Sequence, residues 1–351
     1  MNNITKNKFM MKLYNNIEQI TLKNNLANIK KNIIIKDIDN NPQNYLKDND
    51  FTSDNIKNVI INKLKISNLF SFENNDIIYF TEKKYKNIPK IIIYMFSIIK
   101  LLKELFKKTN YQKVIYFETK EKKKLPNKKI TLGPNEVNSG VTFLNSINNH
   151  SSDNPIFLFR KEEVIKVLIH ELIHSNLIDE KIIINNFDDK LNNKFCANYK
   201  ILLNEAFTET FATIINMFYI NIINHWGKKE LNEMFENELN YSDSICLKIM
   251  KYYNIKTIDE IIKKNNTCNK IFLQNTNILS YYFLKNILLK KHILFGKILD
   301  KNTIHYKIIN NKGILELIHL IFDNIYLLQE KNNILLNKSK SLRLCYYELK
   351  V

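Results

Sequence analysis

The chain has 351 residues, 45% of them hydrophobic, which is enough for one large or two moderate domains with a sizeable core. Its net charge of +18 comes mainly from lysines spread along the whole chain, which argues against a specific nucleic-acid groove. We expect neither a signal peptide nor a membrane span, because the N-terminal stretch is polar and the most apolar run, 91–99, is too short.

The elements predicted for residues 1–85 form an N-terminal accessory region. Residues 5–35 have the spacing of a helix. Residues 43–85 combine loops with short strands, of which 76–80 is the clearest because it is rich in β-branched and aromatic residues.

The next region, 86–178, is predicted to contain a long helix, a small sheet and a second helix. The apolar run belongs to a buried helix over 88–108. Strand-like segments follow it at 113–119, 128–132, 140–144 and 156–159. Glycines and prolines gather just before the second helix, where turns are needed.

The second helix carries the most informative motif of the chain, His-Glu-Leu-Ile-His at 170–174. It lies in a stretch, 162–177, that lacks Gly and Pro and is apolar around most of its circumference. Histidines four residues apart project from one face and can bind the same Zn²⁺ ion, with the Glu171 carboxylate beside a water on that ion. Burying these groups without a partner costs on the order of several kcal/mol, so the pattern favours a zinc site over hydrogen-bonded core histidines.

A third ligand is predicted in the region 179–351, which is mostly helical because all five prolines precede residue 156. After a loop at 179–195, Glu205 and Glu209 lie four residues apart on a helix with apolar surroundings and no nearby lysine. We expect Glu205 to bind the metal and Glu209 to accept a hydrogen bond from the far nitrogen of a ligand histidine.

The cysteines and the end of the chain give weaker signals. The four cysteines, Cys196, Cys246, Cys268 and Cys345, show neither paired spacing nor the density of a disulfide scaffold. We therefore expect reduced thiols in an intracellular, cytoplasmic setting and no cysteine-based zinc site. The segment 342–347 fits a strand and a helix equally well.

Together the two helices resemble the gluzincin branch of the zincin metallopeptidases, the thermolysin-like group. In that group His-Glu-x-x-His is followed by Asn-Glu-x-x-x-Asp/Glu, here residues 204–209. The resemblance implies an α+β, zincin-like fold. A small mixed sheet and the active-site helix would form an upper lobe (86–178), and the remainder (179–351) a mostly helical lower lobe.

The same resemblance implies a zinc-dependent metallopeptidase. His170, His174 and Glu205 would be the Zn²⁺ ligands, Glu171 the general base, and Glu209 the acid that supports a ligand histidine. The substrate would be a peptide or protein. The absence of an aminopeptidase-type Gly-x-Met-x-Asn motif favours internal cleavage.

A metzincin-like site is the alternative, with Glu180 or the adjacent Asp179 as third ligand. It needs the motif helix to stop sharply, normally at a glycine three residues after the second histidine. Leu177 stands there, and a leucine does not adopt positive φ cheaply, so we favour Glu205.

The resemblance also implies a hydrogen-bond donor for catalysis and a strand that binds the substrate. A donor to the tetrahedral intermediate is expected from the lobe facing the helix, with Tyr281 and Tyr282 as candidates and His225 and His292 behind them. Gly140–Leu144 has the composition of the edge strand that binds the substrate, and it fits an ordinary strand after a Gly-Pro turn equally well.

A narrower resemblance connects 132–140, the motif and 280–285 with uncharacterised zincin-like proteins of large DNA viruses, which would imply an intracellular or virion-associated peptidase. Two other hypotheses compete with an active endopeptidase. One is a zincin fold kept as a binding or structural module without turnover, against which Glu171 argues because a structural site needs no general base. The other is a basic, nucleic-acid-associated protein in which the motif is incidental.

Overall fold

The computed structural model describes residues 3–39, 41–46, 52–143, 155–185, 187–265, 267–329 and 339–349. The α+β class predicted from the sequence is confirmed, because a six-stranded mixed sheet in the first half precedes a predominantly helical second half.

The sheet has the spatial strand order β1-β2-β3-β4-β6-β5. Its strands are β1 (Ile34–Lys36), β2 (Ile66–Ser71), β3 (Asn75–Thr81), β4 (Gln112–Phe117), β5 (Gly140–Thr142) and β6 (Ile156–Leu158). β3, β4 and β6 run parallel, whereas β1–β2, β2–β3 and β5–β6 are antiparallel pairs. β5 is therefore an edge strand, and no other strand of the described residues pairs with its outer side.

Successive side chains of the sheet point to opposite faces, and each face has its own core. Ile78 of β3 lies in the smaller core together with residues of α3 (Asp54–Lys63). Ile77 lies in the larger core with residues of α4 (Lys90–Phe106) and α6 (Val164–Ser175). The long apolar helix and the motif helix predicted from the sequence are thus both confirmed.

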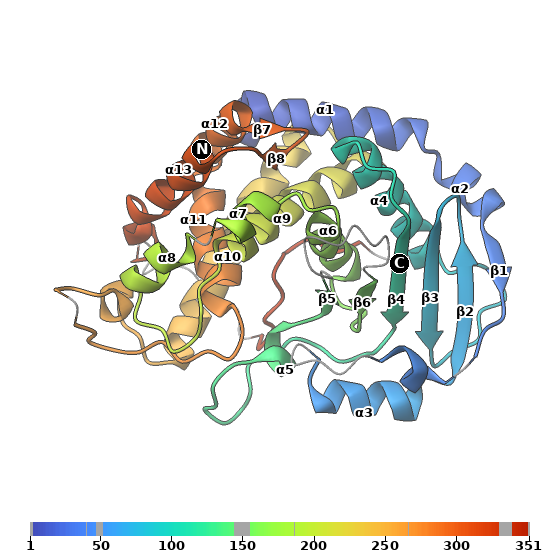
Figure 1. Ribbon diagram of the computed structural model, residues 1–351, viewed down its shortest axis with the longest axis horizontal. Helices are drawn as coiled ribbons and strands as arrows, with labels where there is room; N and C mark the ends of the chain where they lie inside the picture. Colours follow the sequence, from blue (N-terminus) through green and yellow to red (C-terminus); the bar gives the residue numbers. More distant parts are fainter. Residues whose placement is uncertain are drawn as a thin grey trace.

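The remaining elements make up the N-terminal arm and the helical half. The helices are α1 (Lys8–Lys23), α2 (Leu26–Asn32), α5 (Pro134–Val137), α7 (Glu180–Ile184), α8 (Asp188–Lys194), α9 (Leu203–Ile223), α10 (Lys228–Tyr252), α11 (Lys285–Lys290), α12 (His292–Asn302) and α13 (Asn311–Phe322). Short 3-10 segments, one π-helical segment (η4) and a two-stranded ribbon complete the list: η1 (Ile4–Lys6), η2 (Pro42–Tyr45), η3 (Ile258–Ile261), η4 (Leu279–Leu284), η5 (Ile325–Gln329), β7 (Thr303–Ile304) and β8 (Lys307–Ile308). Figure 1 shows the sheet on one side, α8 and α11 to α13 on the other, and α6 and α9 between them.

α9 is the central helix of the second half. By length and composition alone it could cross a membrane, but 94% of its most apolar stretch is buried inside the molecule, as in the core helix of a soluble protein. It packs against α6, α1, α10 and α11. The expected absence of a membrane span stays a prediction.

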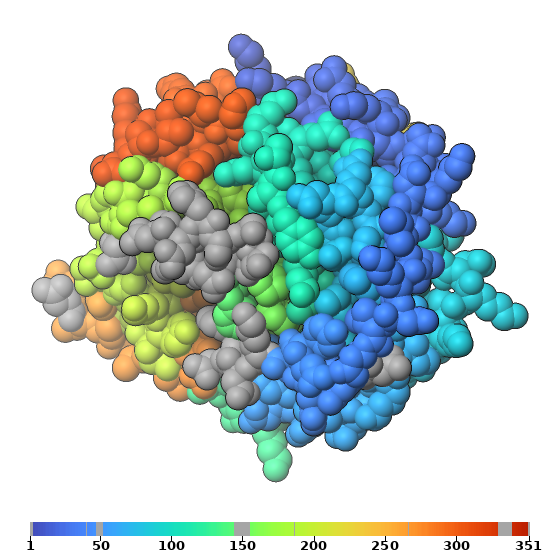
Figure 2. All heavy atoms as spheres, turned by 45° about the vertical axis from the view of Figure 1, so that its right-hand side comes forward, coloured from blue at the N-terminus to red at the C-terminus, as the bar shows by residue number. Residues whose placement is uncertain are grey.

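The N-terminal helix α1 lies across both halves, because it packs against α4, α9 and α12. Figure 2 shows the blue N-terminal residues beside the orange-red C-terminal helices on one face of the molecule. The larger core contains Leu13, Leu168 and Phe207, one from each predicted region. The bounds of those regions at 85 and 178 stay a prediction.

Two local predictions are corrected. The strand expected at 128–132 is wrong, since only Leu132 forms an isolated bridge, with Gln274. The Tyr252 hydroxyl binds the main chain of this segment, donating to a carbonyl and accepting from the Ile130 N–H, so no strand partner is needed. The expected loop at 179–195 contains α7 and α8.

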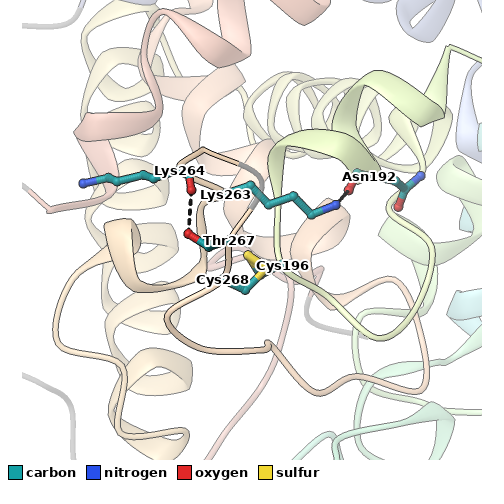
Figure 3. Close-up of a disulfide and its surroundings, with 6 residues drawn as sticks. All are labelled: Asn192, Cys196, Lys263, Lys264, Thr267 and Cys268. Carbon is teal, nitrogen blue, oxygen red and sulfur yellow. Dashed lines mark hydrogen bonds between the residues drawn. A yellow bond between two sulfur atoms is a disulfide. The ribbon is translucent and has the colours of Figure 1, made fainter.

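The predicted state of the cysteines is also corrected. Cys196, in the loop before α9, and Cys268, in the loop after η3, form a disulfide, so reduced thiols were the wrong expectation for this pair. The other two cysteines are free and buried. Figure 3 shows the bridge and, close to it, Lys263, whose side chain extends to Asn192 and donates a hydrogen bond to the Asn192 carbonyl at 3.0 Å. The bonded cysteines are 72 residues apart, and sequence spacing cannot reveal such a pairing.

Candidate metal centre

α6 presents the two histidines of the motif side by side. His170 and His174 are separated by four positions, so they lie on one face of the helix, and their exposed fractions are only 7% and 8%. Their Nε2 atoms lie 3.0 Å apart. The apolar sequence around them buries the helix between the sheet and α9, so the imidazoles are largely shielded from bulk water.

The first turn of α9 brings Glu205 to the same place. Its Oε2 lies 3.3 Å from His170 Nε2 and 3.5 Å from His174 Nε2. This oxygen is buried and accepts no well-formed hydrogen bond from the described residues. The gathering of these three residues, predicted from two separate motifs, is therefore observed.

The spacing of the three atoms fits a metal ion. Bonds of about 2.0–2.1 Å at tetrahedral angles place two ligand atoms about 3.3 Å apart, and the three distances here are 3.0, 3.3 and 3.5 Å. His170, His174 and Glu205 could hold a metal ion. Two imidazole nitrogens and a carboxylate oxygen are also the kinds of ligand that zinc accepts.

Each histidine is oriented through its other ring nitrogen. His170 Nδ1 lies 3.0 Å from Glu209 Oε2, as predicted, and His174 Nδ1 lies 2.7 Å from Asp179 Oδ2. A carboxylate that accepts the Nδ1 proton fixes the tautomer whose Nε2 lone pair is free for a metal.

The alternative third ligands take other positions. Leu177 does adopt positive φ, 55°, so the sharp helix stop that we expected a leucine to disfavour is present. Nevertheless Glu180 pairs with Lys307, and Asp179 binds the Nδ1 side of His174, away from the Nε2 that faces Glu205. The geometry therefore favours Glu205 over the metzincin-like arrangement.

The charges of the centre depend on one another. Burial opposes ionisation of Glu205, but His174 and His170 outweigh it and hold the pKa of this carboxyl well below its usual range. Burial likewise opposes protonation of His174, yet Asp179 and Glu205 raise its pKa well above the ordinary value. In the metal-free protein, protons on the imidazoles thus supply positive charge that a divalent cation can replace.

Glu171 follows His170 in α6 and faces the edge strand β5. Thr142 Oγ1 of β5 donates a hydrogen bond to Glu171 Oε2 at 2.8 Å. A Cβ at Gly140 would come within 3.0 Å of Glu171 Oε1 and 2.8 Å of Val167, so only glycine permits this close approach. Burial raises the pKa of Glu171 above the ordinary value of a glutamate.

Of the predicted donors, the structure brings only Tyr281 to the centre. Its ring centroid lies 6.0 Å from that of His170. Burial and the neighbouring Glu205 raise the pKa of Tyr281 well above its ordinary value, so the hydroxyl keeps its proton. With Gly140 and Glu171 it lines a cavity of about 30 Å³, which has room for about one or two water molecules.

The other three candidates are elsewhere. Tyr282 donates its hydroxyl proton to Leu342 O at 2.7 Å and faces the C-terminal segment. His225 is exposed at the end of α9. His292 is buried against Phe235, with ring centroids 4.6 Å apart.

Three residues of the site were not recognised for their role in the sequence. Asp179 was considered only as a ligand, and Thr142 only as part of a strand. Lys166, buried in α6, pairs with Glu209. A lone lysine in an apolar helix, four residues before a ligand histidine, is the signal that could have revealed it.

Comparisons of this chain with protein-family models, curated proteins and solved structures find no significant match.

Proposed function

We propose that this chain is a zinc-dependent metallopeptidase with a zincin-like fold, and that it cleaves internal peptide bonds. The observation that carries the proposal is the triangle formed by His170 Nε2, His174 Nε2 and Glu205 Oε2, whose three sides match the ligand spacing of a metal ion. Glu171 and Tyr281, a candidate general base and a candidate hydroxyl donor, line one cavity together with His170.

Zinc is the metal that suits this donor set. Two neutral imidazoles and one carboxylate form the protein ligand set of zinc hydrolases, and the fourth position stays open for water or substrate. When bound, zinc would polarise the scissile carbonyl and lower the pKa of a water molecule.

Side chains of the protein would supply the remaining catalytic roles. Glu171 takes the proton of the attacking water and delivers it to the leaving amine, a role that fits its raised pKa and its place beside the centre. Thr142 holds this carboxylate by its hydrogen bond. Tyr281, on the opposite wall, donates its hydroxyl proton to the developing oxyanion as a hydrogen bond.

The edge strand β5 supplies a place for a peptide. Its inner side pairs with β6, and its outer side has no strand partner among the described residues. A substrate in extended conformation could add to this edge through main-chain hydrogen bonds. Because Thr142 of β5 contacts Glu171, a bound peptide would lie next to the general base.

Three variants test the proposal on full-length protein, with metal content and cleavage of an unfolded protein mixture as readouts. Glu171→Gln is expected to keep zinc and to lose activity by roughly 10²–10⁴-fold. Glu205→Ala is expected to lose both zinc and activity. Glu180→Ala, the matched control, is expected to keep both because its carboxylate pairs with Lys307.

The outcomes separate the hypotheses. A zinc-replete, active Glu205→Ala variant would contradict the ligand assignment. Wild-type protein that binds zinc stoichiometrically but cleaves nothing would instead indicate a binding or structural module, and protein without zinc affinity would refute the metal centre.

A further inference from the structure

The C-terminal segment, residues 339–349, is held by buried side chains rather than by a helix or a sheet. Cys345 N donates a hydrogen bond to Glu163 Oε1, and Tyr346 N donates one to Glu238 Oε2, each at 2.7 Å. Both acceptors are almost completely buried. Buried amide groups need such partners, so the segment is specifically docked on these carboxylates.

Glu163 belongs to four buried charges, which we call the ionic cluster: Lys123, Glu163, Lys166 and Glu209. None of them is more than 2% exposed. Lys123 Nζ lies 3.0 Å from Glu163 Oε2, and Lys166 Nζ pairs with Glu209 Oε1. Two lysines balance two glutamates, and buried charges are tolerated when each is paired in this way.

The ionic cluster reaches the back of the metal centre. Glu163 directly precedes α6, where its carbonyl accepts the Val167 N–H at 2.9 Å, and Lys166 lies three residues later in the first turn of this helix. Glu209 contacts Lys166 through Oε1 and His170 Nδ1 through Oε2, the latter at 3.0 Å. The contact from Cys345 to Glu163 and the contacts from Lys166 through Glu209 to His170 therefore meet in the first turn of α6.

We propose that Lys166 is a positioning residue of the metal centre, held in place by the docked C-terminal segment through Glu163. The proposal rests on the metal centre proposed above. It adds that the C-terminal segment influences how firmly this centre binds its metal ion. The ion pair with Lys166 fixes the Glu209 carboxylate, so that its other oxygen accepts the Nδ1 proton of His170.

Loss of the lysine has a predictable consequence. A neutral side chain at 166 leaves Glu209 without its ion-pair partner, and the imidazole of His170 loses its fixed orientation. Partners that orient a ligand histidine typically affect metal affinity by about 10–100-fold. Because coupling between two sites is reciprocal, metal binding must also stabilise the docked segment.

The first test is a Zn²⁺ titration of full-length protein against a competing chelator. Lys166→Met is expected to bind Zn²⁺ about 10–100-fold more weakly than wild type, and Lys166→Arg, which keeps the charge, is expected to recover most of the loss. Lys161→Met is the matched control, because this half-exposed lysine pairs with Glu118 at 3.0 Å. Equal affinities of wild type and Lys166→Met would overturn the proposal.

A second variant covers the case in which Lys166→Met does not fold. Glu163→Gln keeps the shape of the side chain and an oxygen for the Cys345 amide, but removes the charge next to Lys166. It is expected to weaken Zn²⁺ binding in the same direction. Unchanged affinity in this variant would likewise overturn the proposal.

Hydrogen exchange of the wild-type protein tests the part played by the C-terminal segment. Addition of Zn²⁺ is expected to slow amide exchange within 339–349, and this slowing is expected to be smaller in Lys166→Met. Identical exchange with and without Zn²⁺ would overturn the link to the segment. If wild type binds no Zn²⁺ at all, the proposed function itself fails, which distinguishes the two failures.

Discussion

The metal centre and the ionic cluster are two groups of buried charge that meet at Glu209, and they are completed in different ways. In the ionic cluster each charge has an opposite charge from the chain itself. In the metal centre carboxylates bind the Nδ1 atoms of both histidines, while the two Nε2 atoms and Glu205 Oε2 face one another at 3.0, 3.3 and 3.5 Å. The first arrangement pairs opposite charges of the chain, whereas the second is a group of three ligand atoms that could hold a metal ion.

The largest expected effect is the loss of stability caused by a substitution in the ionic cluster. Glu163→Leu leaves Lys123 without its buried partner and is expected to lower the free energy of unfolding by about 3–5 kcal/mol. Glu233→Leu is the control, because this exposed glutamate pairs with Lys229 only at 4.0 Å and should change stability by less than about 1 kcal/mol. Denaturant unfolding measures both, and equal costs would contradict the scaffold role.

A change beside the metal centre should affect activity instead. Thr142→Val removes the hydrogen bond to Glu171, which is worth about 1.5–3 kcal/mol for a charged acceptor. We therefore expect activity to fall by roughly ten- to a hundredfold with bound zinc retained. Thr142→Ser keeps the hydroxyl and is expected to stay near wild type. A loss of zinc in Thr142→Val would show that this hydrogen bond affects the metal ligands as well as Glu171, and would contradict the prediction.

The smallest expected effect is a pH dependence of the ionic cluster. Burial opposes the charge of Glu163, but Lys123 and Lys166 outweigh it and lower the pKa of this carboxyl from its ordinary 4.5. A carboxyl with a lowered folded-state pKa stabilises the fold above its unfolded pKa, and this contribution is lost as the pH falls through the folded value. The stability advantage of wild type over Glu163→Gln should therefore be full near pH 7 and shrink below about pH 4.5. An advantage that grows on acidification would contradict the assignment.

The elements that bring the site together were predictable because their patterns are local. The apolar run of α4, the motif of α6 and the paired glutamates of α9 each have the spacing of a buried helix face. The His-Glu-x-x-His motif, together with Glu205 and Glu209, then left few other ways to satisfy these five polar groups on apolar helices. This is why a contact between residues 31 or more positions apart could be predicted.

The remaining features depend on tertiary structure. Tyr281 and Tyr282 are neighbours on a π-helical turn, and only the packing decides that the first faces the centre and the second the C-terminal segment. Leu177 adopts positive φ at the end of α6, where its N–H and that of Ile178 bind the carbonyls of His174 and Ile173. The partners of Lys166 come from α9, and sequence spacing does not show them.

X-ray absorption at the zinc edge of the reconstituted protein tests the central claim most directly. The account predicts one zinc per chain with two imidazole nitrogens and one carboxylate oxygen at about 2.0–2.2 Å. It predicts that the Glu205→Ala variant no longer retains zinc. A zinc ion with sulfur ligands, or one whose coordination and occupancy are unchanged in Glu205→Ala, would contradict it.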